Sequence, residues 1–225
     1  MFPNIPFRRV DWISSSFLIG TFLLTITAVP WYLFTFQWDW FMFGMFGILY
    51  MAAGLSITVG YHRLFSHRTF KAKKPIRLFT LIFGAAAFEN SALEWCSDHR
   101  NHHKHVDTDD DPYDISKGFF WAHIGWILFT LKTPPPLDNV SDLKRDPLII
   151  WQHKWVHVIA FTIGFGLPTL AGYLYADITG VMTTAQGLLG GFLIGGVARV
   201  TCVQHSTFFI NSLCHMVGKQ TYSSE

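Results

Sequence analysis

Four long apolar stretches limit the folds that this chain can adopt. The first, residues 12–36, contains no charged side chain, and residues 41–60, 155–175 and 181–203 are similarly apolar. About 20 residues of helix cross the roughly 30 Å hydrocarbon core of a bilayer. The first stretch is too long for the core of a signal peptide. The pattern therefore predicts an all-α membrane protein with four transmembrane helices.

The composition agrees with a membrane protein. Half of the residues are hydrophobic and 14% are charged, against roughly 25% charged in soluble domains. Cys96, Cys202 and Cys214 form no CxxC pair and no even set, so they indicate neither a zinc ribbon nor a disulfide framework. No feature of the sequence predicts a nucleic-acid partner or a separate soluble domain. We therefore expect residues 1–225 to form a single integral-membrane domain.

The positive charges are distributed unevenly around the apolar stretches. The two short connections between paired stretches carry Asp39 and Asp177 and no basic residue. Lys and Arg gather before the first stretch, between the second and third, and at or beyond the end of the fourth. By the positive-inside rule, both termini and residues 61–154 and 204–225 are predicted to be cytoplasmic. All eleven histidines then lie at or near the cytoplasmic membrane surface.

A histidine-rich segment, residues 94–111, is the strongest sign of chemistry in the sequence. On a helix with about 100° per residue, His99, His102 and His103 fall on one face, and His105 points to the other side. Imidazoles that converge on one face suit iron, copper or zinc rather than magnesium or calcium. A solvated polar helix is the alternative, and histidines elsewhere in the chain argue against it.

The acidic residues at the end of this segment invite a calcium-loop interpretation, which fails. Pro112 occupies the place of the EF-hand glycine, and no glutamate closes the loop at its twelfth position. We expect the carboxylates either to orient ligating histidines or to solvate a loop. The residues concerned are Asp107, Asp109, Asp110 and Asp111.

Further histidines occupy matching places in the predicted topology. His62 and His67 follow the second apolar stretch, and Asn211 and His215 follow the fourth. With the three histidines of residues 94–111 they make six imidazoles, more than one ion needs, so two metal ions are expected. Neutral imidazoles leave positions where O₂ can bind. A long acyl chain can reach such a site from the bilayer, and removing hydrogen from an unactivated methylene requires redox-active iron rather than zinc.

Four segments carry a resemblance to a known family. They are His62-Arg-Leu-Phe-Ser-His67, Glu94-Trp-Cys-Ser-Asp-His99-Arg-Asn-His-His103, Gly118-Phe-Phe-Trp-Ala-His123-Ile-Gly-Trp126 and Asn211-Ser-Leu-Cys-His215. The chain resembles the membrane-bound fatty-acid desaturases that act on acyl-CoA or acyl-lipid, especially the delta-9 branch, from about residue 40 to residue 218. The resemblance implies four transmembrane helices with a cytoplasmic, histidine-rich di-iron cap.

The same resemblance assigns roles to individual residues. It implies that two Fe²⁺ ions are held by His62, His67, His99, His102, His103 and His215, with Asn211 acting through a water molecule. It places Asn90, Trp95 and Asp98 near the bound acyl chain or its head group, and Thr207 and Phe208 at the bend of the substrate tunnel.

The resemblance also implies a reaction and partners. The expected reaction is O₂-dependent introduction of a cis double bond, delta-9 by this branch, into a long-chain acyl-CoA or acyl-lipid in the membrane. Electrons are expected from a separate donor such as ferredoxin or cytochrome b5. The family has a later His-x-x-His-His cluster that has no match within residues 1–225. We therefore expect this chain to be a C-terminally truncated form with incomplete iron loading and little activity.

Two rival functions remain open from the sequence. A membrane hydroxylase or ketolase has similar histidine boxes, and an inactive protein can use its histidines for structural metal binding or for none. The histidines outside the six are expected to serve packing or hydrogen bonding, although His205 could be a ligand; they are His123, His153, His157 and His205. The basic residues of 68–77 are expected to contact an acidic carrier or anionic lipid.

Overall fold

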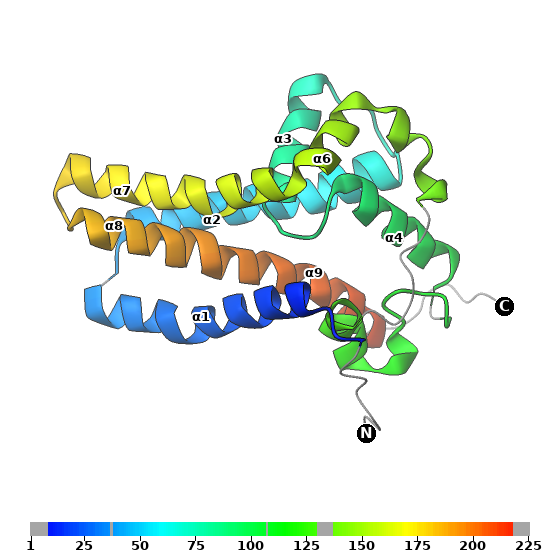
Figure 1. Cartoon of the computed structure of the whole chain (residues 1–225), viewed down its shortest axis with the longest axis horizontal. Helices are drawn as coiled ribbons and strands as arrows, with labels where there is room; N and C mark the ends of the chain where they lie inside the picture. Colours follow the sequence, from blue (N-terminus) through cyan, green and yellow to red (C-terminus); the bar gives the residue numbers. More distant parts are fainter. Residues whose placement is uncertain (1–8, 37, 107, 130–136, 218–225) are drawn as a thin grey trace.

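The computed structural model describes residues 9–36, 38–106, 108–129 and 137–217. Within these residues the regular structure is helical, and four continuous helices are long and apolar enough to cross a membrane. These four helices run alongside one another (Figure 1), which confirms the prediction of an all-α fold with four candidate spans. They are Trp12–Phe36, Trp40–Ser66, Pro147–Thr179 and Thr184–Met216.

The first two spans begin where a carboxylate caps the helix. Helix α1 (Trp12–Phe36) starts after Asp11, which accepts hydrogen bonds from the backbone N–H groups of Ile13 and Ser14. Helix α2 (Trp40–Leu55) starts at Asp39, whose carboxylate accepts from the N–H of Met42 at 3.1 Å. Such caps satisfy N–H groups that have no partner within the helix. Asp39, in the short connection expected between the first two spans, therefore marks the start of the second span.

The second, third and fourth spans are longer than the apolar stretches that predicted them. The second continues from α2 through the π-helical segment η2 (Ser56–Ser66), beyond the predicted end at residue 60. The third span was expected at 155–175 and consists of α6 (Pro147–Phe161), η7 (Thr162–Gly166) and α7 (Leu167–Thr179). The fourth was expected at 181–203 and consists of α8 (Thr184–Gly190), η8 (Gly191–Ala198) and α9 (Arg199–Met216).

Polar residues in these spans form hydrogen bonds with other segments of the chain. Gln152 is fully buried and donates to the hydroxyl of Tyr61 at 2.7 Å, and Gln204 donates to the carbonyl of Phe88 at 3.2 Å. Arg199, expected at the end of the fourth span, lies inside it and donates to carbonyl oxygens of other segments. Apolarity marks the part of a helix that lipid can cover, whereas the helix itself continues for as long as its polar side chains find partners.

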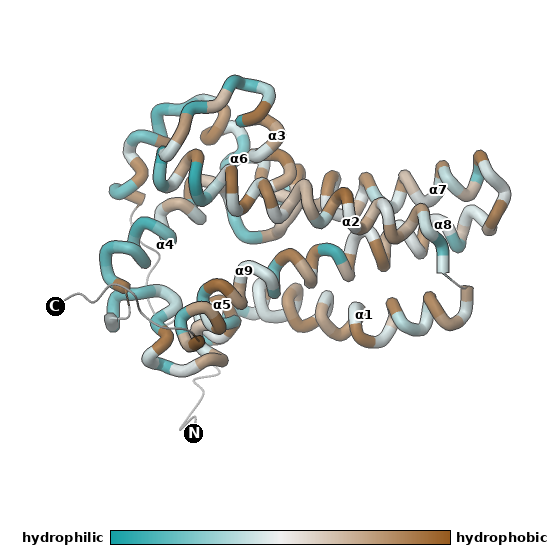
Figure 2. The backbone as a smooth tube through the Cα atoms, turned by 180° about the vertical axis from the view of Figure 1, so that it is seen from behind, coloured by the Kyte–Doolittle hydropathy of each residue, from teal (hydrophilic) through white to brown (hydrophobic). Residues whose placement is uncertain are grey.

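The polar cap gathers at one end of the bundle. It contains α3 (Lys74–Ala85), α4 (Ala92–Lys104) and the start of α6, and both the beginning of α1 and the end of α9 lie at this end (Figure 1). Figure 2 shows hydrophilic residues concentrated there and hydrophobic residues along the four long helices. Its shorter helices are η3 (Ile115–Lys117), η4 (Trp121–Gly125), α5 (Trp126–Leu128), η5 (Asp138–Val140) and η6 (Leu143–Arg145).

The mostly apolar residues 76–95 do not form one continuous helix. They divide into α3 and the first turn of α4, with a turn between them in which Phe88 and Asn90 have positive φ angles of 58° and 68°. Ser91 and Glu94 then form a capping box that starts α4. Positive φ is rare for residues other than glycine, so this turn is held in place by its surroundings. The turn brings residues 88–90 beneath the histidines.

Glycines allow the last two spans to pack closely. A methyl group added at Gly172 would collide with the carbonyl oxygen of Gly187, and one added at Gly187 would collide with the carbonyl oxygen of Gly172. Only glycine permits this approach of two helix backbones. The fourth span therefore carries a glycine surface that allows close helix packing.

Candidate metal site and adjoining cavity

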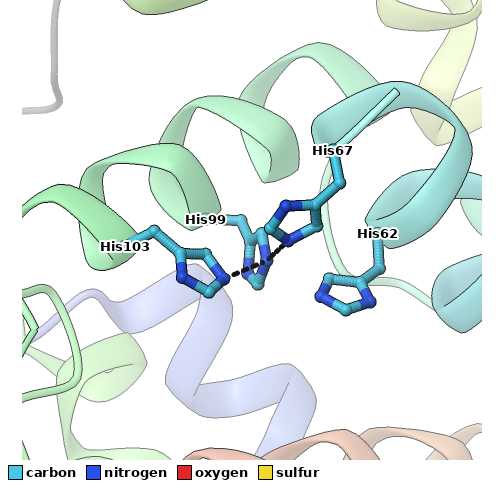
Figure 3. Close-up of side chains that lie close together, drawn as sticks. All are labelled: His62, His67, His99 and His103. Atoms are coloured by element: carbon cyan, nitrogen blue, oxygen red, sulfur yellow. Dashed lines mark hydrogen bonds between the residues drawn. The ribbon is translucent and has the colours of Figure 1, made fainter. Parts of the chain in front are cut away.

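Four histidine side chains from two elements converge at the polar end of the bundle. His62 lies on η2 and His67 directly follows it, while His99 and His103 lie one turn apart on α4 (Figure 3). One ring nitrogen from each lies within 4.8 Å of the others. The Nε2 atom of His99 is 3.0 Å from the Nε2 atoms of both His67 and His103. We call this set the four-histidine group.

Arg100 joins the two elements that carry this group. Its guanidinium donates to the carbonyl oxygens of Phe65 and Ser66 at the end of η2, at 3.0 and 3.1 Å. It also forms a two-pronged ion pair with Asp142, with N–O distances of 2.7 and 3.0 Å. The ion pair lowers the pKa of Asp142 and raises that of Arg100. Because these bonds fix α4 against η2, they set the separation of the histidine pairs.

Burial and neighbouring imidazoles favour the neutral form of His99 and His103 in this group. Burial, and then the neighbouring histidines, lower the pKa of His99 to about 2, and the same causes lower the pKa of His103. Neutral imidazole has a free nitrogen lone pair, which a metal ion requires. Four such donors within reach of one another suit iron, copper or zinc. The donor set therefore fits a transition-metal ion.

His102 does not join the other two histidines of its helix. It is 6% exposed, and its Nδ1 atom lies 2.8 and 2.9 Å from the carboxylate oxygens of Asp111. Its ring packs 5.4 Å from that of His215 and 4.3 Å from that of Tyr113. His102 thus lies beside the four-histidine group, with its ring centre 6.2 Å from that of His99, and is not a member of it.

His102 and His215 therefore form a second group beside the first. The Asp111 carboxylate oxygens lie within hydrogen-bonding distance of His102 Nδ1, as expected for a group that orients a ligand and leaves Nε2 for the metal. Tyr113 lies between the two groups, with its hydroxyl 3.5 Å from Nδ1 of His99. The six histidines chosen from the sequence meet at one end of the bundle; their roles as ligands stay a prediction.

A cavity of about 330 Å³ adjoins the four-histidine group. Its wall includes His62 and His99, together with apolar side chains such as Phe17 and Phe161. All five residues expected to contact substrate line it, as does Asn211; the five are Asn90, Trp95, Asp98, Thr207 and Phe208. The structure thus collects residues from distant parts of the chain around one space.

Glu89 is a cavity residue that the sequence did not single out. Thr207 donates to its Oε1 atom at 2.9 Å, and the Trp95 indole donates to its Oε2 atom at 3.3 Å. Burial raises the pKa of this carboxyl to about 8, and burial also raises the pKa of Asp98 to about 7. The available signal was a glutamate in an otherwise apolar stretch, which indicates a functional role more often than a structural one.

The remaining histidines form hydrogen bonds away from the metal groups. His123 lies 2.9 Å from both Nδ1 of His205 and the hydroxyl of Ser212. His153 lies 2.8 Å from the hydroxyl of Ser91. These contacts agree with the expected packing and hydrogen-bonding roles. His157 differs because it lines the cavity.

A bundle of four candidate membrane spans, with clustered histidines that could hold a metal ion beside an apolar cavity, is typical of a membrane-bound metal-binding class of protein. A profile described as "Fatty acid desaturase" matches residues 38–225. The chain belongs to the fatty acid desaturase family, and its four candidate spans are those of an integral membrane protein.

Individual relatives support this membership. A probable acyl-CoA desaturase of Schizosaccharomyces pombe is 39% identical over 96% of this chain and 42% of its own length. A stearoyl-CoA desaturase of Capra hircus is 36% identical over 89% of this chain and 53% of its own length. A delta(9)-fatty-acid desaturase of Caenorhabditis elegans is 35% identical over 85% of this chain and 55% of its own length. The chain spans about half the length of the curated relatives that it matches.

Proposed function

We propose that the protein to which this chain belongs desaturates a long-chain fatty acyl group, using O₂ and two iron ions to introduce a cis double bond. The relatives named for acyl-CoA and stearoyl-CoA support an acyl-CoA substrate, and the delta(9) relative supports that position for the double bond. The observation that carries the proposal is the apolar cavity whose wall contains His62 and His99. It gives an acyl chain direct access to the histidines.

The two histidine groups would each hold one iron. The first ion would be bound by the four-histidine group, and the second by His102 and His215, with Asn211 acting through a water molecule. Iron supplies the oxidising power needed to remove hydrogen from an unactivated methylene. The neutral imidazoles prepare the site because no proton must leave His99 before it binds metal.

The cavity residues position the acyl chain. Phenylalanine side chains at positions 17, 88 and 161 pack on one another and line the space, which favours an apolar chain over water. Trp95 stacks on His99 with ring centres 4.8 Å apart, so it extends the aromatic wall of the cavity beside this histidine. Thr207 and Phe208 shape the wall opposite α4, where the chain would bend.

The remaining parts of the proposal concern sidedness and the electron donor. The positive charges around the spans support cytoplasmic termini and a cytoplasmic metal site. Electrons would come from a separate carrier such as ferredoxin or cytochrome b5. The residues flanking η2 include Arg68, Lys71 and Lys73, which are exposed and suit an acidic carrier or an anionic membrane surface.

Product analysis tests this function. The protein carrying residues 1–225 would be expressed in cells that lack their own acyl desaturase, and the fatty acids would be analysed by mass spectrometry with double-bond localisation. We expect a monounsaturated product two hydrogens lighter than the saturated chain, and its loss in a His99→Ala variant. An oxygen-containing product would favour a hydroxylase. Saturated acids alone, with measured iron bound, would refute desaturation.

A further inference from the structure

Glu89 places an ionisable group in the wall of an apolar cavity, where the proposed reaction gives it no role. It belongs to the turn between α3 and α4, and this turn is fixed by the positive φ angles of its neighbours Phe88 and Asn90. Its two oxygens face Thr207 on α9 and Trp95 on α4. The carboxyl therefore bridges the two helices on either side of the cavity.

The surroundings of this carboxyl disfavour its charged form. None of the ion pairs among the described residues includes Glu89. Aromatic rings occupy the adjoining wall, with Phe17 and Phe88 stacked 4.8 Å apart. Burial raises the pKa of the Glu89 carboxyl to about 8, so it holds its proton at neutral pH. A carboxylate in such a place would need water, and water competes with an apolar occupant.

We propose that the cavity accepts an acyl chain only while Glu89 is protonated, so that Glu89 acts as a proton-controlled gate for the substrate. This inference rests on the proposed function, because the occupant is taken to be an acyl chain. The gate would close as the pH rises. The coupling is reciprocal. An acyl chain that fills the cavity excludes water, so Glu89 binds its proton more tightly when the chain is present.

The hydrogen bonds can satisfy the protonated carboxyl without water. With its proton on Oε1, Glu89 donates to the Thr207 hydroxyl, which in turn donates to the carbonyl oxygen of Val203 at 3.4 Å. Oε2 still accepts from the Trp95 indole. In the ionised form the direction of the first bond reverses, and the carboxylate has further acceptor positions that only water can fill. The neutral state is therefore the one compatible with a dry cavity.

The effect of Glu89 on the pH dependence must be distinguished from the effects of other titratable groups near the cavity. Those on the surrounding elements are Tyr61 and His62 on η2, Asp98 and His99 on α4, Tyr113 in the segment after α4, His157 on α6 and Arg199 on α9. Asp98 is the strongest competitor, because it lines the same cavity and burial raises its pKa to about 7. Glu94 is a suitable control, since its side chain caps α4 at Ser91 and does not line the cavity.

The test measures occupancy rather than turnover. The chain, in nanodiscs of zwitterionic lipid, would receive a spin-labelled stearic acid methyl ester, which has no group that titrates between pH 6 and pH 9.5. Electron paramagnetic resonance then measures the immobilised fraction of the probe. With a pKa of about 8, the apparent affinity should fall about tenfold from pH 7 to pH 9. Glu89→Gln, which mimics the protonated form, should abolish this fall, and Glu94→Gln should leave it unchanged.

Each remaining result counts against the gate in a different way. A fall that persists in Glu89→Gln but disappears in Asp98→Asn would assign the effect to Asp98 and overturn the proposal. Immobilisation that does not change with pH in the unmodified chain would also overturn it, while leaving the acyl cavity intact. Absence of immobilised probe at every pH, in a chain shown by circular dichroism to be helical, would overturn both the gate and the proposed substrate.

Discussion

The two histidine groups lie side by side but are held in place in different ways. The four-histidine group depends on the docking of α4 against η2, which Arg100 secures through backbone carbonyls. His102 is buried and is oriented by a carboxylate from the segment that follows α4. Helix packing therefore sets the geometry of the four-histidine group, whereas a hydrogen bond sets the orientation of His102. Variants can therefore weaken one position without the other.

The largest expected effect comes from removing the central ligand of the first group. His99→Ala should weaken metal binding at that position more than about 100-fold, since the loss of a ligand exceeds the loss of a group that merely orients one. Metal titration followed by elemental analysis would measure this. His105→Ala is the matched control, because His105 lies at the end of the same helix outside both groups. Equal losses in the two variants would contradict the assignment.

The second group should respond to the loss of its carboxylate. Asp111→Asn should lower metal affinity at the His102 position by about 10- to 100-fold, because the amide no longer holds the imidazole as strongly as a carboxylate does. The four-histidine position should be unaffected. Asp109→Asn, which changes a fully exposed carboxylate nearby, provides the control. Loss at both positions would show that the two groups are not independent.

Arg100→Lys should loosen the first group by weakening the join between its two elements. Lysine cannot reproduce the paired bonds to Asp142 together with those to Phe65 and Ser66. We expect a loss of about 2 kcal/mol in unfolding free energy, and weaker metal binding by the four-histidine group. Thermal unfolding measures the first effect. Arg63→Lys, an exposed position on η2, should change neither.

The smallest expected effect is the pH dependence of stability in the metal-free chain. His99 has a lowered folded-state pKa of about 2, whereas in the unfolded chain it binds a proton near pH 6.5. Below that pH the unfolded state binds more protons, so stability falls as the pH falls. Between pH 7 and pH 5.5 this one group should cost about 1 kcal/mol. Thermal unfolding at the two pH values should show a smaller difference in His99→Ala; an equal difference would assign the effect to other groups.

Much of the fold follows from short-range patterns. Apolar length located four spans, and the first helix has the predicted bounds, because residues 12–36 contain no charged side chain and Asp11 caps the start of the helix. The second, third and fourth spans were predicted too short. Their extra turns depend on buried partners such as the one Tyr61 provides for Gln152, and no local pattern contains that information.

The candidate site was predictable in its residue types and less so in its grouping. Spacing on a helix brought His99 and His103 together correctly, because it depends only on helix geometry. It could not separate His102 from them, since the separation depends on Asp111 and on the position of α9. Glu89 was seen only as a charge that interrupts an apolar stretch, and its place in the cavity depends on a turn with two positive φ angles.

The sequence by itself determined the number of spans and the histidines that could bind metal, because these depend on composition and on spacing along single helices. Its histidine motifs carried the resemblance to the family. The tertiary structure alone decided which histidines share a group, which carboxylate orients His102, and which side chains enclose the cavity. These features require contacts between residues far apart in the chain. Such contacts are fixed by packing and hydrogen bonding in three dimensions.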